Sequence, residues 1–250
     1  MGHYSLIYRI PYGSLYRLLA AISVFISTSF LSSTAYADDG WLHSFYLRAD
    51  AGYSSTIDND GDLIDTANGR DILEMASENG ARYQVGVGFR HNEYLRYDLT
   101  VSYRDDLMHL GTYRDNLNGV TATNGGLSTS NLTTMLNAYI NPMELAEIHT
   151  GRFSPYLQAG VGWARNEMGN AIIDGDTLNG ATNNDFAWQV GAGLGYAIND
   201  NWKIDLSYRF LDMGQAKSSK DVVGSPQKLT RGASVDLQAH EVLIGLRYQF

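Results

Sequence analysis

The sequence predicts an all-β protein, an eight-stranded antiparallel up-and-down transmembrane β-barrel, and three observations support this fold. First, the last strand alternates, because Val242, Ile244, Leu246, Tyr248 and Phe250 share one face of an extended chain and Leu243, Gly245, Arg247 and Gln249 share the other. This period of two indicates that one face meets an apolar phase and the other a polar one. Second, seven earlier segments alternate in the same way. Third, the connections between segments alternate between short and long, which is typical of outer-membrane barrels.

Each predicted strand is long enough to cross the apolar part of an outer membrane. A strand of nine or ten residues, tilted near 40°, spans roughly 25 Å. A soluble β-sandwich would give the same alternation, but the aromatic residues near strand ends favour lipid. The predicted strands are Phe45–Tyr53, Arg82–Arg90, Leu95–Arg104, Leu132–Ile140, Pro155–Trp163, Phe186–Tyr196, Trp202–Phe210 and about Ala239–Phe250.

The connections predict the orientation of the barrel. His91–Tyr94, Asn141–Ser154 and Asn199–Asn201 are the short connections, and the other four are long and polar. The first of these, Ser54–Ala81, has about 27 residues. Short periplasmic turns and long external loops are the usual pattern, so we expect both mature termini in the periplasm and localisation in a bacterial outer membrane.

The N-terminal segment is typical of a secretory signal peptide. Residues 1–37 contain no acidic residue, and Arg17 precedes an apolar run, Leu18–Leu31, that is too short for a spanning helix. Small residues precede the expected cleavage site between Ala37 and Asp38. We therefore expect cleavage of residues 1–37, which leaves residues 38–250 as the outer-membrane β-barrel domain.

Composition limits the partners and the chemistry. The formal net charge is −9, which argues against a nucleic-acid partner because nucleic acids attract basic surfaces. Cysteine is absent, so the chain forms no disulfides and no thiolate metal sites. No cofactor and no resident metal are expected. Acidic runs at 58–62 and 174–176 are expected to be solvated loops, with cation bridging to lipopolysaccharide phosphates as the alternative.

The inward faces of the strands carry charges of both signs, and eight strands leave an interior that side chains can just fill. Buried charges are costly unless they pair, so we expect a charge network that plugs the lumen. A narrow ion path lined by the same residues is the alternative. The predicted lumen residues are Arg48, Asp50, Arg90, Arg96, Asp98, Arg104, Lys203, Asp205, Arg209, Glu241 and Arg247.

An enzymatic role is not expected. His240 and Glu241 lie at the outer end of the last strand, but adjacent strand residues point to opposite faces and cannot act together directly. No nucleophile with a base and an orienting group stands at a meaningful spacing.

Three segments resemble a known family. Phe186–Gly214, Tyr156–Trp163 and Met135–Tyr139 are similar to strands of the OmpA-like, opacity-type small outer-membrane barrels, especially the RopB-type surface antigens labelled "porin family". The resemblance implies a barrel that serves envelope integrity and host interaction. It also implies that Tyr248 and Phe250 form the C-terminal signal read by the barrel-assembly machinery.

The sequence therefore predicts a monomeric surface protein with a structural and surface-interaction role. Its expected partners are outer-membrane lipid, lipopolysaccharide, the barrel-assembly machinery and host surface molecules. The alternatives are a low-conductance porin for small solutes or ions and an outer-rim lipid-modifying enzyme.

Overall fold

The alternation of the sequence appears in the computed structural model as a sheet with an apolar outer face and a polar inner face. On β10 (Trp202–Lys217), Leu206 and Tyr208 are 54% and 52% exposed, whereas Asp205 and Arg209 are each 2% exposed. A soluble β-sandwich would bury the apolar side chains instead. The β-sandwich alternative is therefore wrong.

The structure describes residues 42–57, 70–77, 80–115, 120–173, 176–217, 219 and 234–250. The predicted signal peptide, residues 1–37, and its cleavage site between Ala37 and Asp38 lie outside these residues. The acidic run at 58–62 and most of the run at 174–176 also lie outside them.

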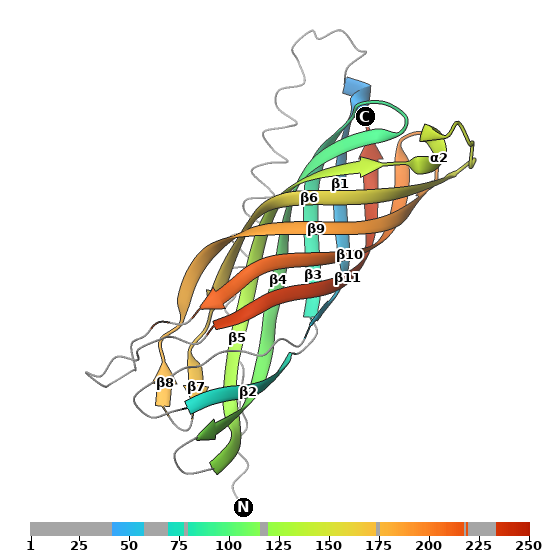
Figure 1. The fold of residues 1–250 in the computed structure, drawn as a ribbon. Helices are drawn as coiled ribbons and strands as arrows, with labels where there is room; N and C mark the ends of the chain where they lie inside the picture. The colour runs from blue at the N-terminus through green and yellow to red at the C-terminus, as the bar shows by residue number, and fades with distance from the viewer. Residues whose placement is uncertain are drawn as a thin grey trace, which may run out of the picture. The chain divides into compact units, whose positions relative to one another are not determined.

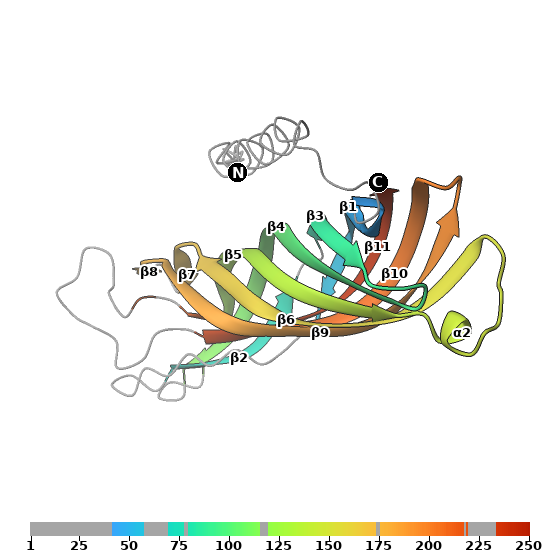
Figure 2. The same cartoon turned by 90° about the horizontal axis from the view of Figure 1, so that it is seen from above.

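Eight strands pair into a closed antiparallel barrel, which confirms the predicted fold (Figure 1). Each strand pairs with its neighbour along the chain, and β1 closes the barrel against β11, with Leu47 opposite Tyr248. Figure 2 shows β1 between β3 and β11. The barrel strands are β1 (Phe45–Thr56), β3 (Gly80–Arg90), β4 (Leu95–Asp115), β5 (Val120–Ile140), β6 (Phe153–Met168), β9 (Ala181–Ala197), β10 (Trp202–Lys217) and β11 (Ser234–Gln249).

Three short connections and Phe250 lie at one end of the barrel, which we call the turn end; the opposite end is the loop end. In each connection an asparagine accepts hydrogen bonds from backbone N–H groups close after it along the chain, which fixes a tight bend. Asn92 Oδ1 accepts from Leu95 N at 2.7 Å, and Asn199 Oδ1 accepts from Trp202 N at 2.8 Å. Asn141 caps the single helical turn α2 (Pro142–Leu145). A 3-10 turn, η1 (Leu42–Ser44), precedes β1.

The loop end contains more strand than the sequence predicts. The sequence predicts a long polar loop as the second long connection, but β4 and β5 continue through it and leave only residues 116–119 between them. The reason is that a continued ladder supplies partners to backbone groups that a long loop would leave to water. The strand bounds predicted on either side of this connection are therefore too short.

Further short strands join the extended hairpin. β2 (Arg70–Ser77), in the first long connection, pairs with the distal part of β4. β7 (Ala171–Ile173) meets β5 at Gly126, and β8 (Asp176–Leu178) pairs with β7. Three connections thus build one sheet beyond the barrel, in the order β2-β4-β5-β7-β8, which we call the distal sheet (Figure 1).

Candidate functional site

The candidate site is the inside of the barrel, because the pleat sends every second residue there. Six arginines and four carboxylates are buried inside it among the described residues. Such a set is costly unless every charge finds partners. The buried charged residues are Arg48, Arg82, Arg96, Arg104, Arg209, Arg247, Asp50, Asp98, Asp205 and Glu241.

Toward the loop end, one carboxylate holds three arginines, and we call this group the Glu241 cluster. Arg104 Nε donates to Glu241 Oε1 at 2.7 Å, and Arg209 Nε donates to Oε2 at 2.6 Å. Arg82 Nη1 also pairs with Oε2. These four side chains come from β3, β4, β10 and β11, so the cluster ties together strands that are far apart in the sequence.

In the middle of the lumen, Asp50 and Asp98 share Arg48, and we call this group the Asp98 cluster. Arg48 Nη2 lies 2.7 Å from Asp50 Oδ1, and Arg48 Nη1 lies 3.1 Å from Asp98 Oδ2. The hydroxyls of Tyr46 and Tyr139 each donate to Asp98 at 3.1 Å. Gln84, on β3, donates to Asp50 Oδ2 at 2.8 Å and accepts a hydrogen bond from Arg209. It therefore connects this cluster with the Glu241 cluster.

At the turn end, Asp205 and two arginines form the mouth cluster. Arg247 Nε donates to Asp205 Oδ2 at 3.0 Å, whereas Arg96 Nη2 is 4.0 Å from Asp205 Oδ1. Arg96 instead stacks its guanidinium on aromatic rings, 4.3 Å from the Tyr139 centroid and 4.5 Å from that of Tyr156. Such cation–π contacts are favourable when desolvated.

Glycines on the inner face make room for the tyrosine rings. Gly88 lies directly across from Tyr46, and Gly193 lies directly across from Tyr156. A Cβ at either glycine would overlap the facing ring. Gly88 on β3 and Gly193 on β9 are therefore packing partners of bulky lumen residues on the neighbouring strands.

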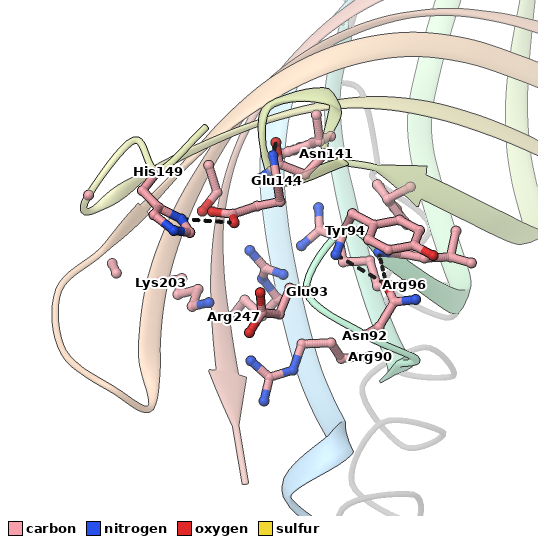
Figure 3. Close-up of a pocket in the computed structure, with 16 residues that line it drawn as sticks. Arg90, Asn92, Glu93, Tyr94, Arg96, Asn141, Glu144, His149, Lys203 and Arg247 are labelled. Carbon is pink, nitrogen blue, oxygen red and sulfur yellow. Dashed lines mark hydrogen bonds and ion pairs between the residues drawn. The ribbon is translucent and has the colours of Figure 1, made fainter. Parts of the chain in front are cut away.

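A cavity of about 360 Å³ opens at the turn end, beside the mouth cluster (Figure 3). Arg90, Arg96, Lys203 and Arg247 line it together with two carboxylates, Glu93 and Glu144. Glu144 lies 3.7 Å from His149. The sequence did not predict this cavity, because its wall combines strand ends with residues of the short connections.

The structure brings together nine of the eleven predicted lumen residues in the three clusters. Arg90 and Lys203 differ, since Arg90 is exposed and Lys203 is half-buried, and both line the mouth cavity. Within the described residues neither makes an ion pair. Arg90 is the last residue of β3 and Lys203 is the second residue of β10, so both lie where the barrel opens to water, which explains the difference.

Sequence reasoning missed Arg82, which is fully buried and pairs with Glu241. Arg82 stands two residues before Gln84 on the same strand, and residues two apart share a face, so the alternation would have placed it inside. The three lumen tyrosines, Tyr46, Tyr139 and Tyr156, also lie on the inner face, but their hydrogen bonds and stacking depend on cross-strand register, which the sequence does not give.

The C-terminal residues complete the closure of the barrel. Phe250 N donates to Phe45 O at 3.1 Å, and its ring, 42% exposed, packs edge-on against Tyr248 at 5.3 Å between centroids. Tyr248 in turn contacts Trp202 at 4.8 Å. Aromatic side chains thus gather on the outer surface at the turn end, where an interfacial belt is expected.

His240 and Glu241, the two outer-rim candidates, point to opposite faces of β11. His240 is exposed and bonds the hydroxyl of Tyr208 through Nδ1 at 2.7 Å, whereas Glu241 is buried in the lumen. Within the described ranges no group of three or more His, Asp or Glu side chains could hold a metal ion. None of the helices described combines the length and apolar character needed to cross a membrane.

Comparison with known proteins identifies the family. The model of the family "Outer membrane protein beta-barrel domain" matches residues 23–250. The chain belongs to this family. Its location is therefore the bacterial outer membrane, and the strands of the barrel are its membrane-spanning segments.

Relatives and solved structures agree with this assignment. Outer membrane protein PagN of Salmonella typhimurium is 33% identical over 103 residues, which cover 39% of this chain and 43% of that protein. A Rickettsia conorii protein named "Putative adhesin RC1281" is 25% identical over 257 residues, covering 92% of this chain and 97% of that protein. The crystal structure of outer membrane protein OprG from Pseudomonas aeruginosa shares the fold, with a TM-score of 0.52, 14% identity, and coverage of 83% and 95%.

Proposed function

We propose that this outer-membrane barrel is a surface attachment protein whose distal sheet contacts molecules of another cell. The single observation that carries the proposal is the length of β4 and β5, 21 residues each. A strand of that length, tilted near 40°, rises roughly 50 Å, about twice the apolar band of an outer membrane. The excess forms a paired sheet and therefore offers a shaped surface rather than separate loops.

The loop end is proposed to face the outside of the cell, with both mature termini in the periplasm. Short connections and the C-terminus lie together at the turn end, and in outer-membrane barrels short connections are periplasmic. The distal sheet then projects away from the cell. The name of the Rickettsia protein, which aligns over nearly the whole chain, supports an attachment role for this arrangement.

The lumen is proposed to be a rigid plug that holds the distal sheet in place. The Glu241, Asp98 and mouth clusters link strands on opposite sides of the barrel, which favours a structural role in the envelope over solute passage. The proposed partners are outer-membrane lipid, lipopolysaccharide, the barrel-assembly machinery and host surface molecules, and the barrel acts as a monomer.

The experiment is removal of the distal hairpin. Residues 107–129, which begin beyond Arg104 on β4 and end at Thr129, opposite Leu107, are replaced by Asn-Gly, a dipeptide that closes tight hairpins. Non-adherent bacteria that display either protein are counted after incubation with cultured epithelial cells. We expect the full chain to increase binding, and the shortened chain to bind no better than bacteria without the protein.

The matched control is a deletion of residues 220–232 in the fourth long connection. Both variants are compared at equal surface levels, and folding is verified by heat-modifiable migration on gels. Unchanged binding after removal of the hairpin, or loss of binding only after removal of 220–232, would refute the distal sheet as the contact surface.

A further inference from the structure

We propose that the mouth cavity at the turn end binds a small phosphate-bearing solute. The proposal is independent of the attachment role, which concerns the opposite end of the barrel. Four cationic side chains surround a cavity of about 360 Å³, the size of a small-ligand site. The chain as a whole is acidic, with a formal net charge of −9, so this concentration of positive charge is local.

Register places like charges directly opposite each other at this mouth. Arg90 faces Arg96 across β3 and β4, and Lys203 faces Arg247 across β10 and β11. Like charges in directly opposed cross-strand positions are destabilising. Two such pairs around one cavity (Figure 3) are explained if an anion occupies it.

In the Glu241 cluster, by comparison, a buried carboxylate of the barrel itself neutralises a pair of like charges. Arg82 and Arg104 also oppose each other across two strands, and Glu241 bonds both. At the mouth, Asp205 bonds Arg247 closely but lies 4.0 Å from Arg96. Glu93 and Glu144 reach the cavity wall, and with Asp205 they offset three of the four positive charges, so one positive charge remains.

Two buried polar atoms of residues at the cavity lack a hydrogen-bond partner among the described residues. Arg96 Nη2 and Tyr156 Oη make no hydrogen bond there, although Arg96 is 8% exposed and Tyr156 is 5% exposed. An unsatisfied buried donor of this kind costs free energy. Both residues line the cavity in which the anion is proposed to bind.

The donors at this mouth suit phosphate. A guanidinium presents parallel N–H groups that match two phosphate oxygens, while a lysine acts as a mobile point charge. Arg96 is held rigid by the rings of Tyr139 and Tyr156, and Arg90 and Lys203 stand free at the rim. The same chemistry would accept the phosphate of a free solute or that of a lipid headgroup.

The test is a titration of the isotope-labelled, folded barrel in zwitterionic micelles with inorganic phosphate, followed by amide chemical shifts. Sodium chloride at matched ionic strength is the reference. We expect saturable shifts around the cavity with phosphate only. The R90Q/K203Q double variant changes only residues outside the three buried clusters, and it should weaken phosphate affinity roughly tenfold or more.

The control is Arg152→Gln, an exposed cation on a turn-end connection that does not line the cavity; its affinity should match the wild type. A repeat in anionic phospholipid micelles distinguishes the source, because a headgroup that fills the cavity would abolish the response to free phosphate. Absence of saturable shifts in zwitterionic micelles, equal shifts with chloride, or equal losses in R152Q and R90Q/K203Q would overturn the proposal.

Discussion

Glu241 is the single carboxylate of the Glu241 cluster, and it bonds three buried arginines, Arg82, Arg104 and Arg209. We expect Glu241→Gln to lower the free energy of unfolding by about 3 kcal/mol or more, because three buried guanidinium groups lose their counter-charge. The measurement is reversible urea unfolding of the barrel in lipid vesicles.

Glu167→Gln is the matched control for that substitution. Glu167 is an exposed carboxylate on β6, near the loop end, and its neutralisation should change stability by less than about 0.5 kcal/mol. If the two variants unfold at the same urea concentration, the lumen network contributes little to stability and the proposed plug is wrong.

At the residue scale, parity along a strand predicts which side chains enter the lumen but not which atoms meet. Arg48 and Asp98 were expected inside, and they meet at 3.1 Å, although they stand 50 residues apart. Gly193 gave no signal of its role, because the ring that fills its space belongs to Tyr156 on a neighbouring strand. Only register fixes such contacts, and register depends on the closure of the whole barrel.

At the scale of one strand, β10 allows a direct comparison of the two faces. Leu206 is 54% exposed on the outer face and Ser207 is 4% exposed in the lumen. Leu206→Arg should cost roughly 2 to 4 kcal/mol, because it sets a charge against lipid near the midplane, whereas Ser207→Ala should cost far less. Equal stabilities of the two variants on refolding into lipid would show that the faces of β10 are assigned wrongly.

The last strand makes a second prediction at this scale. Phe250 directly follows β11 and bonds the start of β1, and its ring lies exposed next to Tyr248. Phe250→Asp should prevent accumulation of folded protein in the outer membrane, because it puts a charge at the lipid interface and removes the proposed assembly signal. Phe250→Tyr keeps an aromatic ring there and should assemble normally. Normal levels of folded Phe250→Asp protein would contradict this role.

Element boundaries were the weakest part of the sequence prediction. Alternation located the membrane-crossing part of β4 and β5, but it did not predict that both continue to residues 115 and 120. Residues 120–130 are rich in threonine, serine and glycine, a composition typical of a loop. Pairing with the partner strand overrides that preference, as strand propensity is strongly dependent on context.

At the scale of the whole molecule, strand number, direction and closure were predictable because outer-membrane barrels obey strict rules. Unpaired backbone groups are not tolerated in lipid, so a sheet must close, and β1 pairs with β11 as required. The mouth cavity escaped prediction because it combines Arg90 and Lys203 from strand ends with Glu144 from α2. Its wall forms only where the closed barrel brings these separate elements together.

The plug and the low-conductance porin make different predictions for planar bilayers. Six buried arginines and four carboxylates fill the lumen among the described residues. If they are fully paired, wild-type protein should show only small or rare openings. Arg96→Ala and Arg209→Ala remove lumen side chains and leave Asp205 or Glu241 with fewer partners, so both variants should show larger openings and lower stability, since an unpaired buried charge is costly.

Arg152→Ala, which removes an exposed arginine outside the lumen, controls for the loss of positive charge and should conduct like the wild type. The buried arginines outnumber the buried carboxylates, so the openings of the lumen variants should pass anions more readily than cations. A large, steady wild-type conductance would replace the plug with the porin. Wild-type and Arg209→Ala channels of equal size would show that the Glu241 cluster does not obstruct the path.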